Sequence, residues 1–434
     1  MVRSPGAAYI LAFNMNLIKH RRWIIYLISC LLFIFSQFYR SSIAVISPNL
    51  VEELDLDTEE LGLISAAFFY AFATMQIPVG IYLDSVGPRF FMTTLSLVAA
   101  AGAIVFAYGE SAAALILGRI LLGLGMACNL MGPLKLITAW FSPLYFATLS
   151  ALFVSVGTAG NIVAATPLVW FTELFGWRTT FLLFSVSNLS IALLFYLVAR
   201  DHPDHLSESR SKTDKTIELS VAFSGFAQLF SRRDYWLISI GTFFRYGIYA
   251  SVQALWAGPL LMAAMGLSPY MTGNMLLAMS IGLIIGSPIC GWISDRILFS
   301  RKAVIITGLV SMAGILILLS VLPVGTWLLL LFALFFAFGF SSGSGQIMYA
   351  HIKERMPRKN AGAAMTGINF FTMAGVAFFL HGLGWAIKEF YPEGVPPPEV
   401  FRAAFAFFAV CLVLTAMSYG WTVDCKLHNQ KTPD

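Results

Sequence analysis

Long apolar stretches separated by short polar ones are the dominant pattern along this chain. The clearest runs cover residues 23–38, 61–83, 235–265 and 327–340. A helix that crosses a bilayer needs about 20 such residues, and only helices and closed barrels pair all their backbone groups within lipid. Barrel strands would be about 10 residues long and would alternate strictly. These runs are longer and do not alternate, so they predict membrane-spanning helices.

Twelve spans are expected, six on each side of a polar segment near the middle of the chain. The predicted spans are 23–50, 58–83, 89–109, 112–139, 146–171, 177–199, 235–264, 271–294, 303–322, 326–350, 361–386 and 400–422. The prediction is therefore an all-α membrane protein with an N-terminal six-helix half (1–200), a cytoplasmic linker (201–234) and a C-terminal six-helix half (235–434). Repeated halves are a common construction of transporters.

Composition and charge support a membrane protein and orient it. Apolar residues make up 58% of the 434 residues and charged residues only 11%. Most of the 27 Lys and Arg residues fall in the N-terminal tail, the even-numbered loops and the C-terminal tail. The positive-inside rule then places both termini in the cytoplasm, and we expect the plasma (inner) membrane. The net charge of +5 suits loops beside anionic lipid rather than nucleic acid, because no basic stripe with interleaved aromatics occurs.

The sequence carries no enzyme signature. It has no Walker loop, no Gly-x-Ser-x-Gly elbow and no cluster at metal-ligand spacing, and its five cysteines are not spaced for a disulfide or zinc site. We therefore expect neither catalysis nor a cofactor. The expected partners are a small anionic or zwitterionic solute and membrane lipid, and the expected state is a monomer.

The two halves share a short cytoplasmic motif. Gly80 ends one helix, Asp84 follows four residues later, and Gly87 and Arg89 lie in the loop beyond. In the second half Gly291 is followed by Asp295 and Arg296. A glycine at this place allows close helix contact, and the aspartate can cap or pair across the cytoplasmic face. A structural hinge is favoured over a substrate site.

These motifs resemble those of the major facilitator superfamily, whose loop between spans two and three carries Gly-x-x-x-Asp. The segment from Gly118 to Gly125, with Arg119, resembles the fourth-span motif of that family. The resemblance covers essentially the whole chain and implies a transporter that works by alternating access. Ser85 stands where the family has a basic residue, so Arg89 is the expected substitute. The resemblance leaves a structural and a coupling role open for Arg119.

Two arginines at membrane depth are the main functional candidates. Arg40 lies in span one and Arg245 in span seven, which are equivalent positions in the two halves. Buried ionisable residues are costly, so each is a functional candidate. Two cations that face one cavity repel each other unless an anion joins them, and arginine binds carboxylate or phosphate with two hydrogen bonds. This pair predicts a substrate with such a group, and it resembles the organic-anion and organophosphate transporters of the family.

Neighbouring polar and aromatic residues extend the predicted substrate site. Those at helical spacing from the arginines, together with two buried amides, are Gln37, Tyr39, Tyr249, Gln253, Trp256, Asn129 and Asn369. For each aromatic residue ordinary packing is the alternative, and for each amide the alternative is a tie between helices.

No acidic residue falls deep within a predicted span, which argues against the carboxylate that many proton symporters use. His381 is the one embedded group that could carry a proton near neutral pH. Uniport, exchange and symport remain open. The favoured function is transport of a small organic anion or another carboxylate-bearing solute, including a peptide. The alternatives are proton-coupled efflux of lipophilic compounds and a membrane sensor that does not transport.

Overall fold

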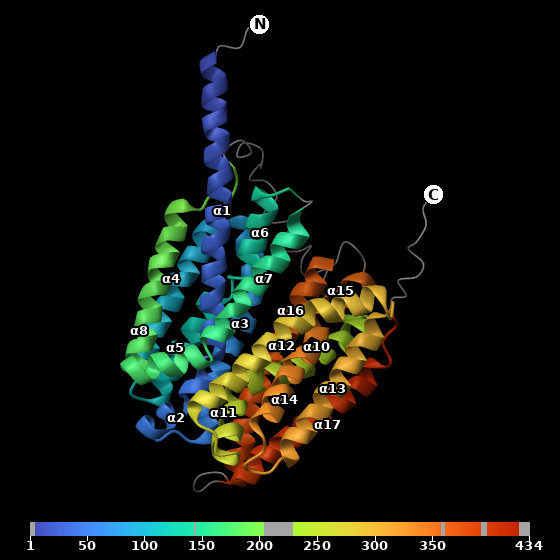
Figure 1. Cartoon of the computed structure of the whole chain (residues 1–434). Helices are drawn as coiled ribbons and strands as arrows, with labels where there is room; N and C mark the ends of the chain where they lie inside the picture. The colour runs from blue at the N-terminus through green and yellow to red at the C-terminus, as the bar shows by residue number, and fades with distance from the viewer. Residues whose placement is uncertain (1–4, 143–144, 204–228, 357–360, 392–396, 425–434) are drawn as a thin grey trace.

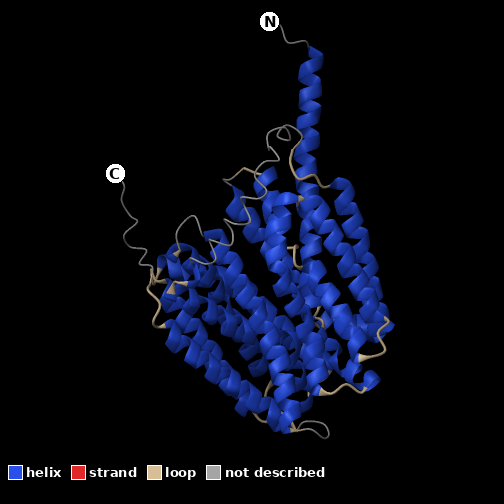
Figure 2. Cartoon of the chain, turned by 180° about the vertical axis from the view of Figure 1, so that it is seen from behind, coloured by secondary structure: helices blue, strands red, loops and turns tan. Residues whose placement is uncertain are grey.

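The computed structural model describes residues 5–142, 145–203, 229–356, 361–391 and 397–424, and within these ranges it contains helices and no strand (Figure 2). The helices of the first half are α1 (Pro5–Ser41), α2 (Ile43–Leu54), α3 (Thr58–Ser85), α4 (Pro88–Ala107), α5 (Ala112–Met126), α6 (Met131–Trp140), α7 (Phe146–Val163) and α8 (Thr166–Val198). Those of the second half are α10 (Arg233–Ser251), η3 (Val252–Trp256), α11 (Ala257–Pro259), η4 (Leu260–Ala264), α12 (Pro269–Arg296), α13 (Arg301–Val321), α14 (Leu328–Ser342), η5 (Gly343–Gly345), α15 (Gln346–Arg355), α16 (Ala361–Phe390) and α17 (Pro398–Tyr419).

Ten helices of the described chain are long and apolar enough to cross a membrane. Several predicted spans are built from two pieces. The span 23–50 contains α1 and α2 with a break at Ser42, and 112–139 contains α5 and α6. At Gly176 the chain turns with a φ of 74°, so α8 joins the end of one predicted span to the whole of the next. The predicted count of twelve spans is therefore not settled by helix length and hydropathy alone.

Local sequence signals explain where several helices begin. The carboxylate of Asp57 accepts the backbone N–H of Glu60 while the Glu60 side chain accepts the N–H of Asp57, which is a capping box at the start of α3. The hydroxyls of Ser111, Ser268 and Ser300 each accept one backbone N–H in the first turn of α5, α12 and α13. These caps satisfy amide groups that the first helical turn leaves without partners.

The helices form two bundles that meet at one end. Helices α1 to α8 form one bundle and α10 to α17 the other, and in both views the bundles converge at the end opposite the two chain termini (Figure 1). Across the junction α3 packs beside α16, α12 beside α7 and α8, and α2 beside η3 and α11. The junction therefore consists of helices that the sequence assigns to different halves.

Small residues and an ion cluster bring the bundles together at this end. A Cβ atom on Gly258 would lie 2.7 Å from the carbonyl oxygen of Ala44, and one on Gly62 would lie 3.2 Å from the Cα of Gly384. The Nζ of Lys388 on α16 lies 2.9 Å from Asp57 and 2.8 Å from Glu59, both at the start of α3. We call Lys388, Asp57 and Glu59 the outer ion cluster, because the predicted topology places them outside the cell.

Candidate functional site

Arg40 and Arg245 are both buried at breaks or distortions in their helices. Arg40 is 8% exposed and lies one residue before the end of α1, where the chain breaks at Ser42. Arg245 is 2% exposed and lies in α10, about two turns before the π-helical segment η3. Such interrupted helices near the middle of the membrane are typical of transporter binding sites.

The guanidinium of Arg40 reaches across to the other bundle. Its Nη1 donates a hydrogen bond of 3.2 Å to the hydroxyl of Tyr246 on α10. Its Cζ lies 5.0 Å from the ring centroid of Phe72 and 6.0 Å from that of Phe69, both on α3. Its Nε is buried and has no hydrogen-bond partner. Aromatic faces attract a cation, but they leave its donors available for a further acceptor.

Arg245 is held from the opposite side. Its Nη1 donates to the carbonyl oxygen of Ser342 at 2.6 Å and to the hydroxyl of the same residue at 3.2 Å. Its Cζ lies 5.4 Å from the ring centroid of Tyr246. Gly345 makes room for it, because a Cβ there would lie 1.8 Å from the Cζ of Arg245. The Nε of Arg245 is also buried without a partner.

The two guanidinium groups therefore flank one tyrosine ring. Tyr246 accepts a hydrogen bond from Arg40 at its hydroxyl and presents its ring to Arg245. In the described part of the chain neither arginine forms an ion pair. Two buried cations without a counter-ion are unfavourable in a low dielectric, and an anion placed between them relieves this.

A chain of neutral polar groups lies on α3, α16 and α15. The Nδ2 of Asn369 donates to the Oε1 of Gln76 at 3.0 Å, which joins the two bundles. The hydroxyl of Tyr349 donates to the Oδ1 of Asn369 at 3.2 Å. Gln76 also donates to the backbone carbonyl of Ala127 at 3.4 Å. Amides and hydroxyls of this kind can exchange these bonds for the hydroxyl groups of a solute.

Sequence reasoning did not select Gln76, Tyr246 or Tyr349. Tyr246 follows Arg245 directly, and helical spacing turns it about 100° away from that residue, so it was not assigned to the same face. Its contact with both arginines arises because Arg40 arrives from the other bundle. Gln76 is a buried amide near the end of α3, and its polarity in an apolar span is the signal that could have identified it.

The other predicted substrate residues occupy different surroundings. The ring of Tyr249 lies 6.1 Å from that of Tyr246, beside the arginine pair. Gln253 donates to the hydroxyl of Ser280 at 2.9 Å. The indole N–H of Trp256 donates to the carbonyl of Phe379 at 3.2 Å, so it ties α16 to η3.

Three predicted residues lie within the first bundle. Tyr39 is fully buried and packs against Phe38 and Phe181. Gln37 is buried and its Oε1 has no partner. Asn129 donates to the backbone carbonyl of Leu32 at 3.3 Å, which ties the fourth predicted span to the first.

Arg119 makes contacts that differ from those of the arginine pair. It is fully buried, and all three of its nitrogens donate to backbone carbonyls, those of Ile64 at 3.2 Å, Ser65 at 3.2 Å and Tyr39 at 2.5 Å. Its Cζ lies 4.8 Å from the ring of Phe68. These bonds join α5 to α1 and α3, which is the geometry of a helix tie.

The first cytoplasmic motif is described only beyond the end of α3. The side-chain surroundings of Gly80 and Asp84 lie outside the described residues. Gly87 has a φ of 91°, and a Cβ there would lie 2.3 Å from the Oδ2 of Asp201. The Oδ1 of Asp201 accepts the backbone N–H of Arg89 at 2.7 Å, and the Nε of Arg89 donates to the carbonyl of Tyr196. A carboxylate from the start of the linker thus caps α4.

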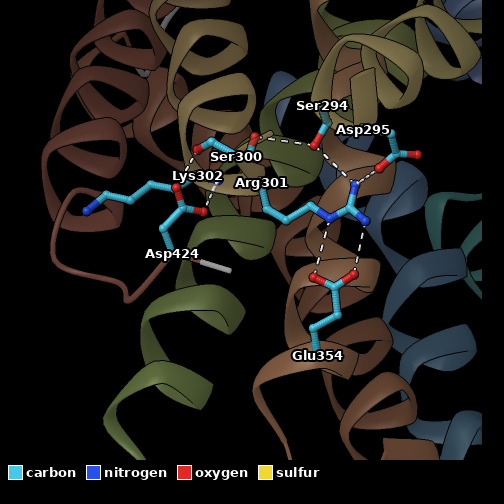
Figure 3. A network of polar contacts seen from close by, with 7 residues as sticks. All are labelled: Ser294, Asp295, Ser300, Arg301, Lys302, Glu354 and Asp424. Atoms are coloured by element: carbon cyan, nitrogen blue, oxygen red, sulfur yellow. Dashed lines mark hydrogen bonds and ion pairs between the residues drawn. The ribbon is translucent and has the colours of Figure 1, made fainter. Parts of the chain in front are cut away.

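The second motif is organised around Arg301 rather than Arg296. Arg301 pairs with Asp295 and, at 3.0 Å, with Glu354, and its Nη1 donates to Ser294 (Figure 3). Arg296 is exposed.

Two further features of this motif emerge only from the structure. The expectation of close helix contact at Gly291 is wrong, because no atom lies within 4 Å of a Cβ built there. Asp424 accepts the N–H of Lys302 at 3.2 Å and the hydroxyl of Ser300 (Figure 3). It therefore caps α13 much as Asp201 caps α4.

His381 lies on α16 and is half-buried. Its ring meets the ring of Tyr70 on α3 edge-on, with centroids 6.3 Å apart. Tyr70 is itself 40% exposed, so this contact lies near the protein surface. A proton-carrying role for His381 stays a prediction.

Comparison with known proteins adds the family context. The family model described as Major Facilitator Superfamily matches residues 28–256 and 238–432. The probable sulfoacetate transporter SauU of Cupriavidus necator is 25% identical over 65% of this chain and 68% of its own. The hexuronate transporter of Escherichia coli is 25% identical over 69% and 73%, and the probable galactarate/D-glucarate transporter GarP of that organism is 23% identical over 93% and 95%.

Solved structures share the fold at low sequence identity. A bacterial homologue of the human lysosomal transporter Spinster, in an inward-facing and unoccupied conformation, superposes with a TM-score of 0.73 at 17% identity, covering 95% of this chain and 99% of that one. The nucleoside transporter NupG superposes with a TM-score of 0.74 at 14% identity, covering 91% and 99%. At these identities the likeness establishes the arrangement of helices.

Proposed function

Because the chain belongs to the major facilitator superfamily and is an integral multi-pass membrane protein, we propose that it is a secondary transporter of a small organic anion, with Arg40 and Arg245 binding the negative group. The observation that carries the proposal is the arginine pair itself. Two buried guanidinium groups from equivalent spans of the two halves flank Tyr246, and neither has an ion-pair partner among the described residues. A carboxylate or sulfonate between them would supply the missing charge.

Relatives whose names state a substrate support an anion with further polar groups. Their names give hexuronate, galactarate or glucarate, and sulfoacetate, all of which carry an acidic group. Gln76, Asn369 and Tyr349 supply amide and hydroxyl groups that suit the hydroxyls of a sugar acid. We assign substrate contacts to these residues and to Tyr249 and Gln253. Gln37 and Tyr39 are also proposed to contact the substrate. Arg119, Asn129 and Trp256 are proposed to position helices.

The proposed mechanism is alternating access by rocking of two six-span halves, residues 1–200 and 235–434, joined by the linker 201–234. Both termini are proposed to lie in the cytoplasm, from the distribution of Lys and Arg. The outer ion cluster then closes the outer end, and the bundles diverge toward the end that carries the termini (Figure 1). With this proposed orientation, the conformation is that of an inward-facing carrier.

The test is uptake of D-glucuronate, D-glucarate and sulfoacetate into proteoliposomes. We expect transport of at least one by the wild type, and a loss of about tenfold or more in Arg40→Gln and Arg245→Gln, because each removes a charged hydrogen bond to the anion. Arg233→Gln is the matched control, since Arg233 is exposed at the start of α10 and its loss removes the same charge. Full uptake by both variants would overturn the proposal. Selective binding of lipophilic cations would favour drug efflux, and anion binding without flux would favour a sensor.

A further inference from the structure

Tyr246 contacts both arginines of the proposed anion site, Arg40 through its hydroxyl and Arg245 through its ring. Its hydroxyl accepts a hydrogen bond of 3.2 Å from Nη1 of Arg40. This nitrogen is one of the donors that a carboxylate would use. The tyrosine ring faces the guanidinium of Arg245. The hydroxyl oxygen thus stands where an anionic oxygen would be expected, and a substrate must compete with it for Arg40.

We propose that the Tyr246 hydroxyl is a built-in substitute for the substrate's anionic group, which holds Arg40 while the carrier is empty and is displaced when the anion binds. This inference rests on the proposed function and deepens it. A hydroxyl oxygen carries a partial negative charge, so it partly compensates a buried cation that has no ion pair. An anion carries a full charge and replaces it.

The contact also joins the two halves. Arg40 belongs to α1 and Tyr246 to α10, so the hydrogen bond links the bundles at the centre of the site. Displacement of the hydroxyl by an anion removes this direct link and replaces it with one that passes through the substrate. The link between the halves therefore changes with occupancy, and an empty carrier and a loaded one are held together by different bonds.

If the hydroxyl and the anion compete for Arg40, removing the hydroxyl should strengthen anion binding. Replacing Tyr246 by phenylalanine removes one oxygen and keeps the ring beside Arg245. If the hydroxyl competes with the substrate, the empty carrier loses a stabilising bond and the loaded one loses nothing, so the anion binds more tightly. A residue that donates to the substrate, or that only supports the fold, would instead weaken binding or leave it unchanged when its hydroxyl is removed.

The experiment measures the Kd of D-glucuronate, D-glucarate and sulfoacetate for the purified full chain, wild type against Tyr246→Phe. We expect Kd to fall by about three- to tenfold, as loss of one competing hydrogen bond of modest net strength would give. Tyr26→Phe is the control, because Tyr26 is buried in the first bundle and donates to the carbonyl of Leu149. Tyr26→Phe also removes one tyrosine hydroxyl oxygen, but from a hydrogen bond within the first bundle, so we expect an unchanged Kd.

A second readout follows the link between the halves. Ser47 is buried on α2, and its hydroxyl would lie 3.6 Å from a Cβ on Gly258 of the other bundle, so it reports on the junction. With Ser47→Cys as the reporter, Tyr246→Phe should speed labelling by a membrane-impermeant maleimide in the absence of anion and leave it unchanged at saturating anion. A Kd that stays constant or rises in Tyr246→Phe, while the wild type binds an anion and Arg40→Gln does not, overturns this inference alone. A wild type that binds none of the three anions overturns the proposed function, and this inference with it.

Discussion

Gly345→Ala should displace Arg245 without changing any charged residue. A Cβ at this position would lie 1.8 Å from Cζ, 1.9 Å from Nη1 and 2.3 Å from Nε of Arg245. Ordinary contact begins near 3.4 Å, so the guanidinium must move by about 1.6 Å. These three atoms are the far end of a flexible side chain, so the helix can accept the methyl group while the guanidinium moves.

The size of the effect follows from Coulomb's law. At an effective dielectric constant of about 20, moving a unit charge from a contact distance of about 4 Å to about 5.6 Å removes roughly 1.2 kcal/mol, or about eightfold in affinity. The bond of 2.6 Å from Nη1 to the carbonyl of Ser342 is also expected to break. We therefore expect the Kd for the transported anion to rise about tenfold.

The assay is anion binding to purified protein, combined with thermal unfolding to confirm the fold. Gly314→Ala on α13 is the control, because no atom lies within 4 Å of a Cβ built there. A double-mutant cycle with Arg245→Lys tests the route of the effect, since the slimmer lysine end leaves room for the methyl group. The reasoning is refuted if Gly345→Ala binds the anion as tightly as the wild type, or if it weakens binding equally with Arg245 and with lysine at that position.

The other predictions concern Arg119 and the outer ion cluster. Arg119→Met should lower the free energy of unfolding by about 3 to 5 kcal/mol, because it removes three charged hydrogen bonds to backbone carbonyls. The anion Kd of the folded fraction should stay within about twofold. Fluorescence-detected thermal unfolding measures the stability, and loss of binding at unchanged stability would contradict this prediction. Lys388→Gln should speed maleimide labelling of Ser47→Cys with and without anion, because it opens the outer end in both states. Burial raises the pKa of Asp57, but the backbone amide of Glu60 and the ammonium of Lys388 outweigh this and hold it below its ordinary value. The cluster should therefore be complete above the ordinary carboxyl pKa of about 4 and be lost only as pH falls through the lowered value; faster labelling already at pH 6 would contradict this.

Much of the helix arrangement was predictable because lipid imposes a simple length requirement. Helix α12, for instance, covers residues 269–296 where the sequence predicted a span at 271–294. The breaks were not predictable in the same way. Ser42 and the turn at Gly176 interrupt apolar segments whose hydropathy continues across them, because a kink changes the backbone and leaves composition unaltered.

For the arginine pair, too, the sequence predicted one part and only the structure showed the other. Arg40 and Arg245 were identified as candidates because a charge at membrane depth is costly and is seldom present without a role. Tyr246, Gln76 and Asp201 contact Arg40, Asn369 and Arg89, which lie 112 to 293 residues away from them along the chain. Spacing along one helix carries no information on such partners.

The sequence by itself determined the lipid solvent and the helical class, and it marked Arg40 and Arg245 as costly charges, because transfer of residues between water and lipid is a local property of the sequence. Only the tertiary structure decided that Arg119 is tied to three carbonyls while Arg40 and Arg245 meet at one tyrosine. All three arginines are buried. What separates them is which acceptors the packing of distant helices brings within hydrogen-bond distance, and that depends on the whole fold.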